Sequence, residues 1–442
     1  MTSDRPADSS SEETLYVWMH LPDQPDPVVA GRLDRTRRVI DNQPVIAFTY
    51  SRQYRELDNA ISLFDAELPL MPGTFDPTDP SQADGHWAGH PAPSARSAKP
   101  LAGAIRDAAP DAWGRRVLSA RLTNNPDIDL GELAYLANAD SNRIGALDFQ
   151  YSASEYVARG TPATLEQLAH AAALIESGTP LPPDLVAAAG HGTSIGGARP
   201  KALLTDDDGT ELVAKFSSTS DHRPVVRAEA LGMLFATRLG LDAPRVRVQG
   251  IDTGADVLLA DRFDRTPQGG RRMMVSALTI LGYRESEARY ASYVELARSI
   301  RHPGWSRPRE TLRELFTRLV LNIAISNNDD HLRNHAAFWD GRELTLTPAY
   351  DLAPQPRNSH VSTQAIGITA DGQSASQYRL AVAAAGEFLI SPAEAKEIVG
   401  HVKDTIETQW DDACDEARLT RSERSQLLRR EFLNPYADYD EA

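Results

Sequence analysis

The sequence predicts a mixed α/β protein whose β-rich units come first and whose helical unit comes last. Runs of β-branched and aromatic residues, separated by turn residues, recur up to about residue 265. After residue 266, apolar residues recur at intervals of three and four, which is the spacing of one helix face. A chain of 442 residues has the length of two to three domains.

The composition is that of a globular protein, with 41% hydrophobic and 24% charged residues. The formal net charge of −16 argues against a broadly basic surface for nucleic acid or an anionic membrane. The single cysteine, Cys414, excludes an intramolecular disulfide and a thiolate metal cluster. The polar start lacks the apolar core of a signal peptide, and no apolar run approaches the roughly 18 residues of a membrane span. We therefore expect a cytoplasmic protein that does not bind membranes.

The first unit is expected over residues 15–150, behind a disordered tail at residues 1–14 that is rich in Ser, Asp and Glu. Six prolines among small polar residues predict a long loop at residues 71–100. The unit contains no candidate catalytic group. Its predicted elements are strands at 15–20 and 45–50, a helix that starts at Pro110, and a turn into a strand at 143–149.

The second unit, residues 151–265, is predicted to hold a β-hairpin with a lysine in its second strand. Thr164 and Gln167 have the spacing of a capping box, which predicts that a helix starts there. After a proline-rich break, a glycine-rich segment leads to two apolar runs that flank an acidic turn. Lys215 lies in the second run. The chain then continues with an amphipathic helix at 227–240 and a pair of strands between 246 and 261.

The third unit, residues 266–442, is predicted to be an all-α C-terminal lobe. Pro308 suits a first helical position, and the apolar residues that follow it form one helix face. Another helix start is predicted at Ser391, with a proline next and a glutamate at the third helical position. The helix that starts at Pro308 leads directly into the most polar stretch of the chain.

That stretch, residues 326–334, contains three amides, two carboxylates and an imidazole, which are costly to bury unless they bind ligands. Asp329 and Asn334 have the Asp-x4-Asn spacing of a kinase catalytic loop, in which the Asp orients the substrate hydroxyl and the Asn binds a metal ion. Asp330 misses this spacing by one residue. Asp351 follows an apolar strand, where a kinase keeps its second metal ligand. A solvated turn rich in Asn and Asp is the alternative for the whole stretch.

Three upstream features fit the same chemistry, although each has a simpler explanation on its own. The segment 196–201 combines two glycines with Arg199 and Lys201, so it can bring N–H groups and charge to a phosphate, but ordinary glycine turns are common. Lys215 can meet an anion or reach the edge of its strand. Glu229, on the following helix, can pair with Lys215 or stay solvated.

The order of these features is more informative than any one of them. A glycine-rich loop, a strand lysine, a helix glutamate, an Asp-x4-Asn pair and a further Asp follow one another along the chain. Each lies on the expected kind of local structure. The sequence therefore predicts ATP-dependent phosphoryl transfer by a two-lobed, protein-kinase-like fold, with a β-rich N-terminal subdomain and nucleotide lobe and a helical catalytic lobe.

At this point the chain resembles the HipA family of serine/threonine kinases, which act as the toxin of a type II toxin–antitoxin pair. The resemblance extends into the first unit, through residues 31–33 and 143–146, and so covers most of the chain. The segments that carry it are Ser194-Ile195-Gly196-Gly197-Ala198-Arg199-Pro200-Lys201, Val213-Ala214-Lys215-Phe216, Asp261-Arg262-Phe263-Asp264-Arg265, Asn328-Asp329-Asp330-His331-Leu332-Arg333-Asn334 and Pro348-Ala349-Tyr350-Asp351.

The resemblance implies roles for individual residues. Asp329 is then the catalytic base, Asn334 and Asp351 bind Mg²⁺, and Lys215 holds the ATP phosphates. Glu229 is the acid that pairs with this lysine. The other implied nucleotide contacts are the loop residues Gly196, Gly197, Ala198, Arg199, Pro200 and Lys201, the adenine connector Asp261, Arg262 and Phe263, and the bordering residues His331, Leu332, Arg333 and Tyr350.

The resemblance also implies regulation and partners. Ser194 matches the autophosphorylated loop serine of the family, and a phosphate there, beside the ATP phosphates, would compete for the same donors and inactivate the kinase. The implied substrate is a component of translation such as an aminoacyl-tRNA synthetase. A HipB-like helix-turn-helix antitoxin would neutralise the toxin and carry most contacts to operator DNA, which is consistent with the acidic charge of this chain.

Three departures from the family pattern concern substrate and partner geometry more than chemistry. Asp330 stands where many members have glycine, Asp261 stands where a glutamate is frequent, and the loop at 71–100 is long. Two other functions stay open. One is a small-molecule phosphotransferase with the same Asp-x4-Asn logic, and the other is a catalytically dead co-repressor.

Overall fold

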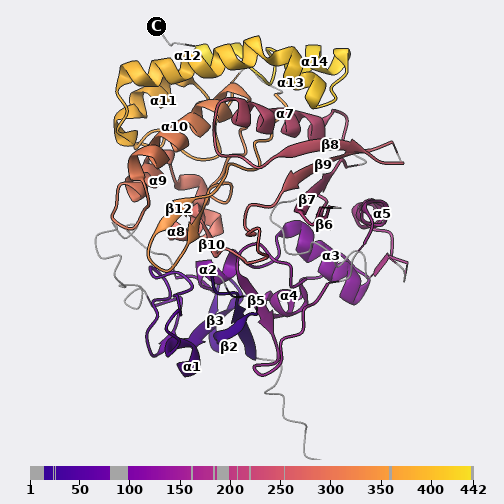
Figure 1. Cartoon of the computed structure of the whole chain (residues 1–442), viewed down its shortest axis with the longest axis vertical. Coiled ribbons are helices and arrows are strands. Elements are labelled where there is room, and N and C mark those ends of the chain that lie inside the picture. The colour runs from indigo at the N-terminus through magenta and orange to yellow at the C-terminus, as the bar shows by residue number, and fades with distance from the viewer. Residues whose placement is uncertain are drawn as a thin grey trace, which may run out of the picture.

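The computed structural model describes residues 14–22, 24, 26–79, 98–160, 163–182, 185–186, 199–206, 208–218, 221–252, 254–357 and 361–439. Three predictions therefore fall wholly or mostly outside the described residues: the tail at 1–14, most of the loop at 71–100, and the loop residues Ser194, Gly196, Gly197 and Ala198. Figure 1 shows the N-terminal strands at one end of the molecule and the C-terminal helices at the other, with a second sheet beside them.

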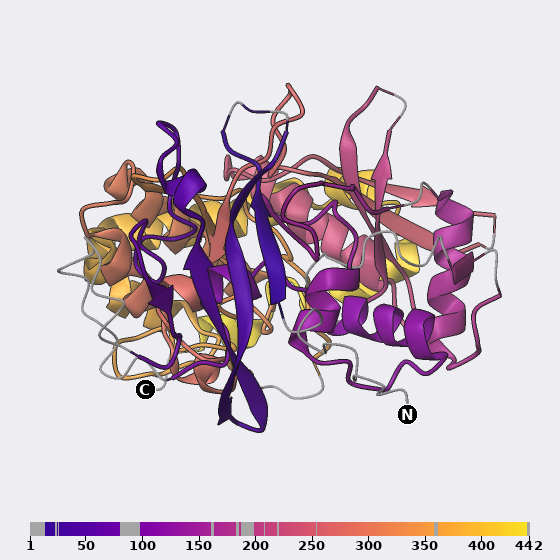
Figure 2. The same ribbon diagram turned by 90° about the horizontal axis from the view of Figure 1, so that it is seen from below.

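The N-terminal sheet has five antiparallel strands in the order β4-β3-β2-β1-β5. Seen from below, its indigo strands cross the middle of the molecule in front of yellow C-terminal helices (Figure 2). Asp41 and Asn42 both have positive φ angles, which suits the tight turn between β2 and β3. The strands are β1 (Thr14–Met19), β2 (Val28–Ile40), β3 (Gln43–Tyr50), β4 (Thr74–Phe75) and β5 (Leu147–Gln150).

Four helices accompany this sheet: α1 (Arg52–Arg55), α2 (Gly103–Arg106), α3 (Ala112–Thr123) and α4 (Glu132–Asn138). The sequence predicted that this helix starts at Pro110, but α3 begins two residues later, at Ala112, because Asp111 is its N-cap. The Oδ1 atom of Asp111 accepts a hydrogen bond from the Gly114 N–H at 2.7 Å.

The second sheet has the antiparallel order β6-β7-β9-β8 and confirms the predicted hairpin and strand pair. Its strands are β6 (Lys201–Thr205), β7 (Glu211–Phe216), β8 (Val246–Gly250) and β9 (Asp256–Asp261). Helix α5 (Leu165–Glu176) starts with the predicted Thr164 and Gln167 capping box, and α7 (Val225–Arg238) is the predicted amphipathic helix, shifted by two residues. Lys215 on β7 stands directly opposite Lys201 on β6.

The remaining residues are mainly helical, but the prediction of an all-α lobe is wrong in one respect. A small antiparallel sheet, in the order β10-β11-β12, is built from Met274–Ser276, Ala336–Trp339 and Leu344–Leu346. The helices are α8 (Ala277–Ile280), α9 (Tyr293–Ile300), α10 (Pro308–Ala324), α11 (Tyr378–Ala384), α12 (Pro392–Thr408), α13 (Trp410–Glu416) and α14 (Arg421–Leu427), with 3-10 turns η3 (Glu285–Tyr290), η4 (Ala385–Phe388) and η5 (Pro435–Asp438).

Helix α10 is the centre of the helical part. It starts at Pro308, as predicted, and the apolar side chains of its inner face are fully buried. One continuous hydrophobic core joins this helix to the N-terminal sheet, whereas β7 and β9 also face a separate small cluster with α5. Burial on this scale fixes the position of the chain just after Ala324, where the polar stretch begins. Within the described ranges, no helix is long and apolar enough to cross a membrane.

Candidate active site

Lys215 occupies the centre of the site. It extends from β7, and its ammonium contacts the carboxylate of Glu229 on α7 and the Oδ1 atom of Asp351, the latter at 2.6 Å. The two acids come from segments far apart in the sequence, one on α7 and one after β12. A single cation therefore joins these two segments.

The pKa values of Lys215, Asp351 and Glu229 depend on one another's charges. Burial lowers the pKa of Lys215, but the carboxylates of Asp351 and Glu229 outweigh burial and raise it, so the lysine stays charged. Burial raises the pKa of Asp351, and the ammonium groups of Lys215 and Lys201 more than reverse this, giving a pKa of about 2. Burial and the nearby Asp351 charge raise the pKa of Glu229. We conclude that Lys215 and Asp351 are both ionised at neutral pH.

Lys201 adds a second ammonium to the same face of the sheet. Side chains that stand directly opposite each other on antiparallel strands project to one face, so Lys201 and Lys215 are neighbours. The Nζ atom of Lys201 lies 3.2 Å from Oδ2 of Asp111, the N-cap of α3. Burial lowers the pKa of Lys201, while Asp111 opposes this effect. Two largely buried lysines on one face of the sheet are suited to an anionic ligand.

The turn after α10 arranges the predicted catalytic residues. Asp329 is solvent-exposed, and its backbone carbonyl accepts a hydrogen bond from Nδ2 of Asn334 at 3.2 Å. This contact closes the turn, and no described residue donates a hydrogen bond to the Oδ1 atom of Asn334. Although the residue is exposed, partial desolvation of its carboxylate raises the pKa of Asp329, and His331 opposes the shift, while the negative charges of Asp351 and Asp330 add to it. Asp329 and Asp351 therefore lie within electrostatic reach of each other.

The residues present fit an oxygen-coordinated cation and a nucleotide. Asn327 Oδ1, Asn328 Oδ1 and His331 Nδ1 are buried and have no hydrogen-bond partner within the described part of the chain. Such orphaned atoms are costly without a ligand or water. Asn334 and Asp351 offer the hard oxygen atoms that Mg²⁺ prefers, and Mg²⁺ commonly takes only one or two protein ligands besides substrate phosphates. Among the described residues, no group of three or more His, Cys, Asp or Glu side chains could hold a metal ion by itself.

Several predicted nucleotide contacts have side chains that are engaged elsewhere. Arg262 is buried and donates to Asn142 Oδ1, the Arg143 carbonyl and Asp264, at 2.7 to 2.9 Å. Asp261 pairs with Arg245, which directly precedes β8, at 3.1 Å. These two residues could contact a nucleotide only through other atoms, for example those of the backbone. Phe263, by contrast, packs against the ring of Tyr350, with centroids 5.7 Å apart.

The other predicted nucleotide contacts among the described residues also have partners within the protein. Arg199 pairs with Asp221 at 3.0 Å, and Arg333 pairs with Glu285 at 2.8 Å. Leu332 is completely buried in the hydrophobic core. Pro200 contributes its carbonyl to the N–H of Phe216. Tyr350 donates a hydrogen bond to the Arg333 carbonyl at 2.6 Å. This contact joins the segment before Asp351 to the turn at residues 329–334, which is called the catalytic turn below.

Sequence reasoning missed two residues that shape the site. Asp111 belongs to the first unit, which showed no catalytic group, yet it pairs with Lys201. The helix start at Asp111 could be predicted from the sequence, but its pairing with Lys201, 90 residues away, could not. Asp330, which had no assigned role, turns into the protein interior and accepts three hydrogen bonds there.

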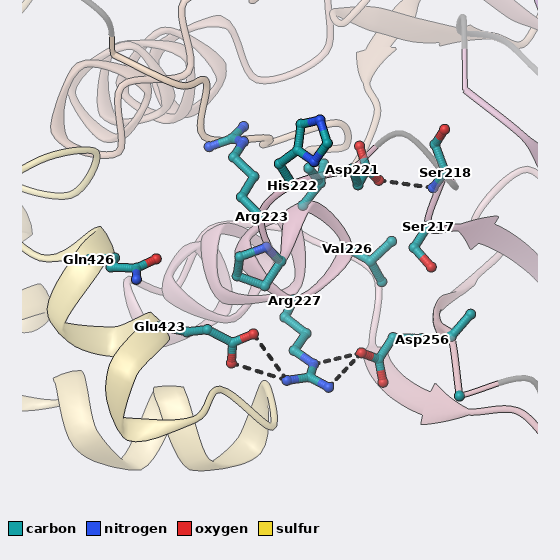
Figure 3. A pocket seen from close by; sticks show the side chains of 14 residues that line it. Ser217, Ser218, Asp221, His222, Arg223, Val226, Arg227, Asp256, Glu423 and Gln426 are labelled. Carbon is teal, nitrogen blue, oxygen red and sulfur yellow. Dashed lines mark hydrogen bonds and ion pairs between the residues drawn. The ribbon is translucent and has the colours of Figure 1, made fainter.

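A separate cavity of about 370 Å³ lies at the start of α7 and does not include Lys215, Asp329 or Asp351. Figure 3 shows Arg227 in its wall, held between Asp256 and Glu423. Two other charged residues of its lining, Asp221 and Arg223, pair with Arg199 and Glu431 outside the cavity.

Comparison with known proteins supports the sequence-based resemblance. Residues 193–410 match the HipA-like C-terminal domain. A HipA chain from the HipA, HipB and operator DNA complex of Shewanella oneidensis MR-1 is 16% identical, with a TM-score of 0.60, and the match covers 96% of this chain and 100% of that chain. These findings confirm the predicted fold class and the resemblance to the HipA family.

A second solved structure, the proinflammatory kinase CtkA of Helicobacter pylori, is 11% identical and covers 49% of this chain and 94% of that chain. Its TM-score of 0.35 is too low to infer a common fold. No curated protein matches the sequence.

Proposed function

Because residues 193–410 form a HipA-like C-terminal domain, we propose that this protein is an ATP- and Mg²⁺-dependent protein serine/threonine kinase. The observation that carries the proposal is the contact of Lys215 with both Glu229 and Asp351. Active protein kinases require an ion pair between a strand lysine and a helix glutamate, together with a metal-binding Asp, and the three residues present here are of these types.

Each residue has a role in this proposal. Lys215 and Lys201 bind the phosphates of ATP, since both ammonium groups face the same side of the hairpin. Asp329, exposed at the mouth of the site, takes or aligns the proton of the substrate hydroxyl. Asn334 and Asp351 hold Mg²⁺. Bound Mg²⁺ supplies charge neutralisation at the transferred phosphoryl group. Catalysis then consists mainly of positioning and electrostatic stabilisation.

The biological role follows from the same resemblance. The Shewanella HipA was solved together with HipB and operator DNA. By analogy, we propose that the present protein is a toxin whose partner is a HipB-like helix-turn-helix antitoxin, and that it reaches operator DNA mainly through that partner. The net charge of −16 supports an indirect contact with DNA. Its substrate would be a translation component such as an aminoacyl-tRNA synthetase.

Autophosphorylation of Ser194 would switch the kinase off. Ser194 precedes the β6 lysine by seven residues, and a phosphate of about −1.5 to −2 charge in this loop would compete with ATP for Lys201 and Lys215. We therefore expect Ser194→Asp to weaken ATP binding, whereas Ser194→Ala leaves it intact.

Incubation of the purified protein with Mg-ATP, followed by phosphopeptide mapping, tests the proposal. Phosphate on Ser194 or on an added protein supports a protein kinase. ATP turnover without phosphate on any protein would favour a small-molecule phosphotransferase. ATP binding without turnover, and no growth defect that Asp329→Ala relieves, would favour a catalytically dead co-repressor.

A further inference from the structure

Asp330 is a buried acid directly beside the proposed catalytic base. Its residue is 1% exposed, and its Oδ2 atom accepts hydrogen bonds from Tyr293 Oη, from Asn322 Nδ2 at 2.7 Å and from His335 Nε2 at 2.9 Å. The donors come from α9, from α10 and from the residue that follows the catalytic turn. A carboxylate oxygen with three donors is well compensated for its burial.

This network extends to the second proposed metal ligand. The Oδ1 atom of Asn322 accepts a hydrogen bond from Asn327 Nδ2 at 2.9 Å, and the same Nδ2 atom lies 3.2 Å from the backbone carbonyl of Asp351. A continuous chain of buried polar contacts therefore runs from His335, which follows Asn334, through Asp330 to Asp351. It passes beneath the residues that the mechanism uses without including their reactive atoms.

The backbone next to the network is held in uncommon conformations. Ser326 and Asp351 have φ angles of +52° and +59°, in the left-handed region that few non-glycine residues adopt. Such conformations persist only when surrounding contacts determine them. The Ser326 carbonyl accepts from the Gln355 N–H at 3.0 Å, so the two segments are also joined directly.

We propose that Asp330 is a positioning residue for phosphoryl transfer. It fixes the turn from Asp329 to Asn334 against α9 and α10, so that both residues face Asp351. The inference rests on the proposed kinase function and adds a residue to it. All three donors bond to the Oδ2 atom, so an amide at position 330 can keep an acceptor oxygen there but loses the negative charge that strengthens these hydrogen bonds.

Matched variants separate positioning from stability. Asp330→Asn removes the charge of the network and His335→Ala removes one of its donors, whereas His335→Gln keeps a donor. Asp148→Asn is the control. Asp148 lies on β5 of the N-terminal sheet, away from the site, and is an equally buried acid that pairs with two arginines. The measured quantities are kcat, the KM for ATP, the thermal unfolding midpoint, and hydrogen exchange of the amides of residues 331–335.

We expect Asp330→Asn and His335→Ala to lower kcat by about 10- to 100-fold, because small displacements of catalytic groups have effects of this size. The KM for ATP should change by less than about threefold, since Lys215 and Lys201 lie outside the network. His335→Gln should recover most of the lost kcat. Asp148→Asn should lower the unfolding midpoint and leave kcat per folded molecule within about twofold of wild type.

Wild-type kcat in Asp330→Asn would overturn the proposal, as would equal losses in His335→Gln and His335→Ala. If the wild-type protein transferred no phosphate, the proposed kinase function would be wrong. Hydrogen exchange would then still test whether Asp330 anchors the turn. Faster exchange of residues 331–335 in Asp330→Asn than in wild type supports the anchor, and unchanged exchange contradicts it.

Discussion

At the scale of single residues, Lys215 determines the charge balance of the site. Its ammonium is the shared partner of Glu229 and Asp351 in a region where burial opposes isolated charge. This explains why a lysine can stand in the middle of an apolar strand. A strand lysine can also extend into solvent at the edge of its sheet. Lys215 does not, because its side chain is only 19% exposed.

Replacement of Lys215 by methionine should lower kcat by at least about 100-fold, because it leaves two carboxylates uncompensated and removes a phosphate ligand. Phosphate transfer to a protein acceptor and Mg-ATP affinity are the measurements. Lys403→Met is the control, since Lys403 pairs with Asp438 on the C-terminal helices. Comparable activity in both variants would show that Lys215 has no catalytic role.

Residues 326–334 show what sequence spacing can and cannot predict. The Asp-x4-Asn spacing selected Asp329 over Asp330, and the structure places Asp329 at the surface and Asp330 in the interior. The two aspartates are chemically identical in the sequence. Their different environments depend on Tyr293 and Asn322, which lie 37 and 8 residues before Asp330, so a local pattern could not assign the role of Asp330.

At the scale of secondary structure, the elements with strong local signals were predictable. The start of α10 at Pro308, the capping box of α5 and the β6–β7 hairpin follow from residue type and period alone. The sheet of β10, β11 and β12 did not follow. Its strands have three or four residues, and the pairing of β10 with β11 joins residues 60 to 64 positions apart, so only tertiary packing specifies this sheet.

Helix α3 links the first unit to strand β6 through its N-cap. Asp111 accepts from the Gly114 N–H with one oxygen and pairs with Lys201 through the other. Asp111→Asn keeps a capping oxygen and loses the charge, whereas Asp111→Ala loses both. We expect urea unfolding to show Asp111→Ala less stable than Asp111→Asn by about 1 kcal/mol, the usual contribution of an N-cap. Equal stabilities would mean that the cap contributes nothing here.

At the scale of the whole molecule, buried charge clusters stabilise the first unit and join it to the second. Asp148 is completely buried and pairs with Arg143 at 2.9 Å and with Arg159 at 2.6 Å. Asp264, just after the predicted connector, accepts from the Gly145 N–H at 2.8 Å. The Asp264 contact joins the first unit to the segment that follows β9. It combines residues that sequence analysis assigned to separate units.

The Asp148 cluster predicts a dependence of stability on pH. Burial raises the pKa of Asp148, but Arg143 and Arg159 outweigh burial and lower it from 3.8 to about 2. A depressed carboxyl pKa stabilises the folded state above the unfolded pKa, and this contribution disappears as the pH falls toward the folded value. Asp148→Asn should therefore lose about 2 kcal/mol of this contribution at pH 7, and the loss should shrink between pH 4 and pH 2.

Urea unfolding of wild type and Asp148→Asn across this pH range is the appropriate measurement. A difference in unfolding free energy that stays constant, or grows as the pH falls, would contradict the assignment of charge to Asp148.

The central claim is that the site transfers phosphate to protein and that Asp329 is required. The most direct measurement compares the phosphoproteomes of cells that express wild type, Asp329→Ala or the control Asp412→Ala, in which an exposed acid on α13 is removed. We expect the same phosphosites, including Ser194, in wild type and Asp412→Ala, and their absence in Asp329→Ala. Identical phosphoproteomes in wild type and Asp329→Ala would contradict the kinase function.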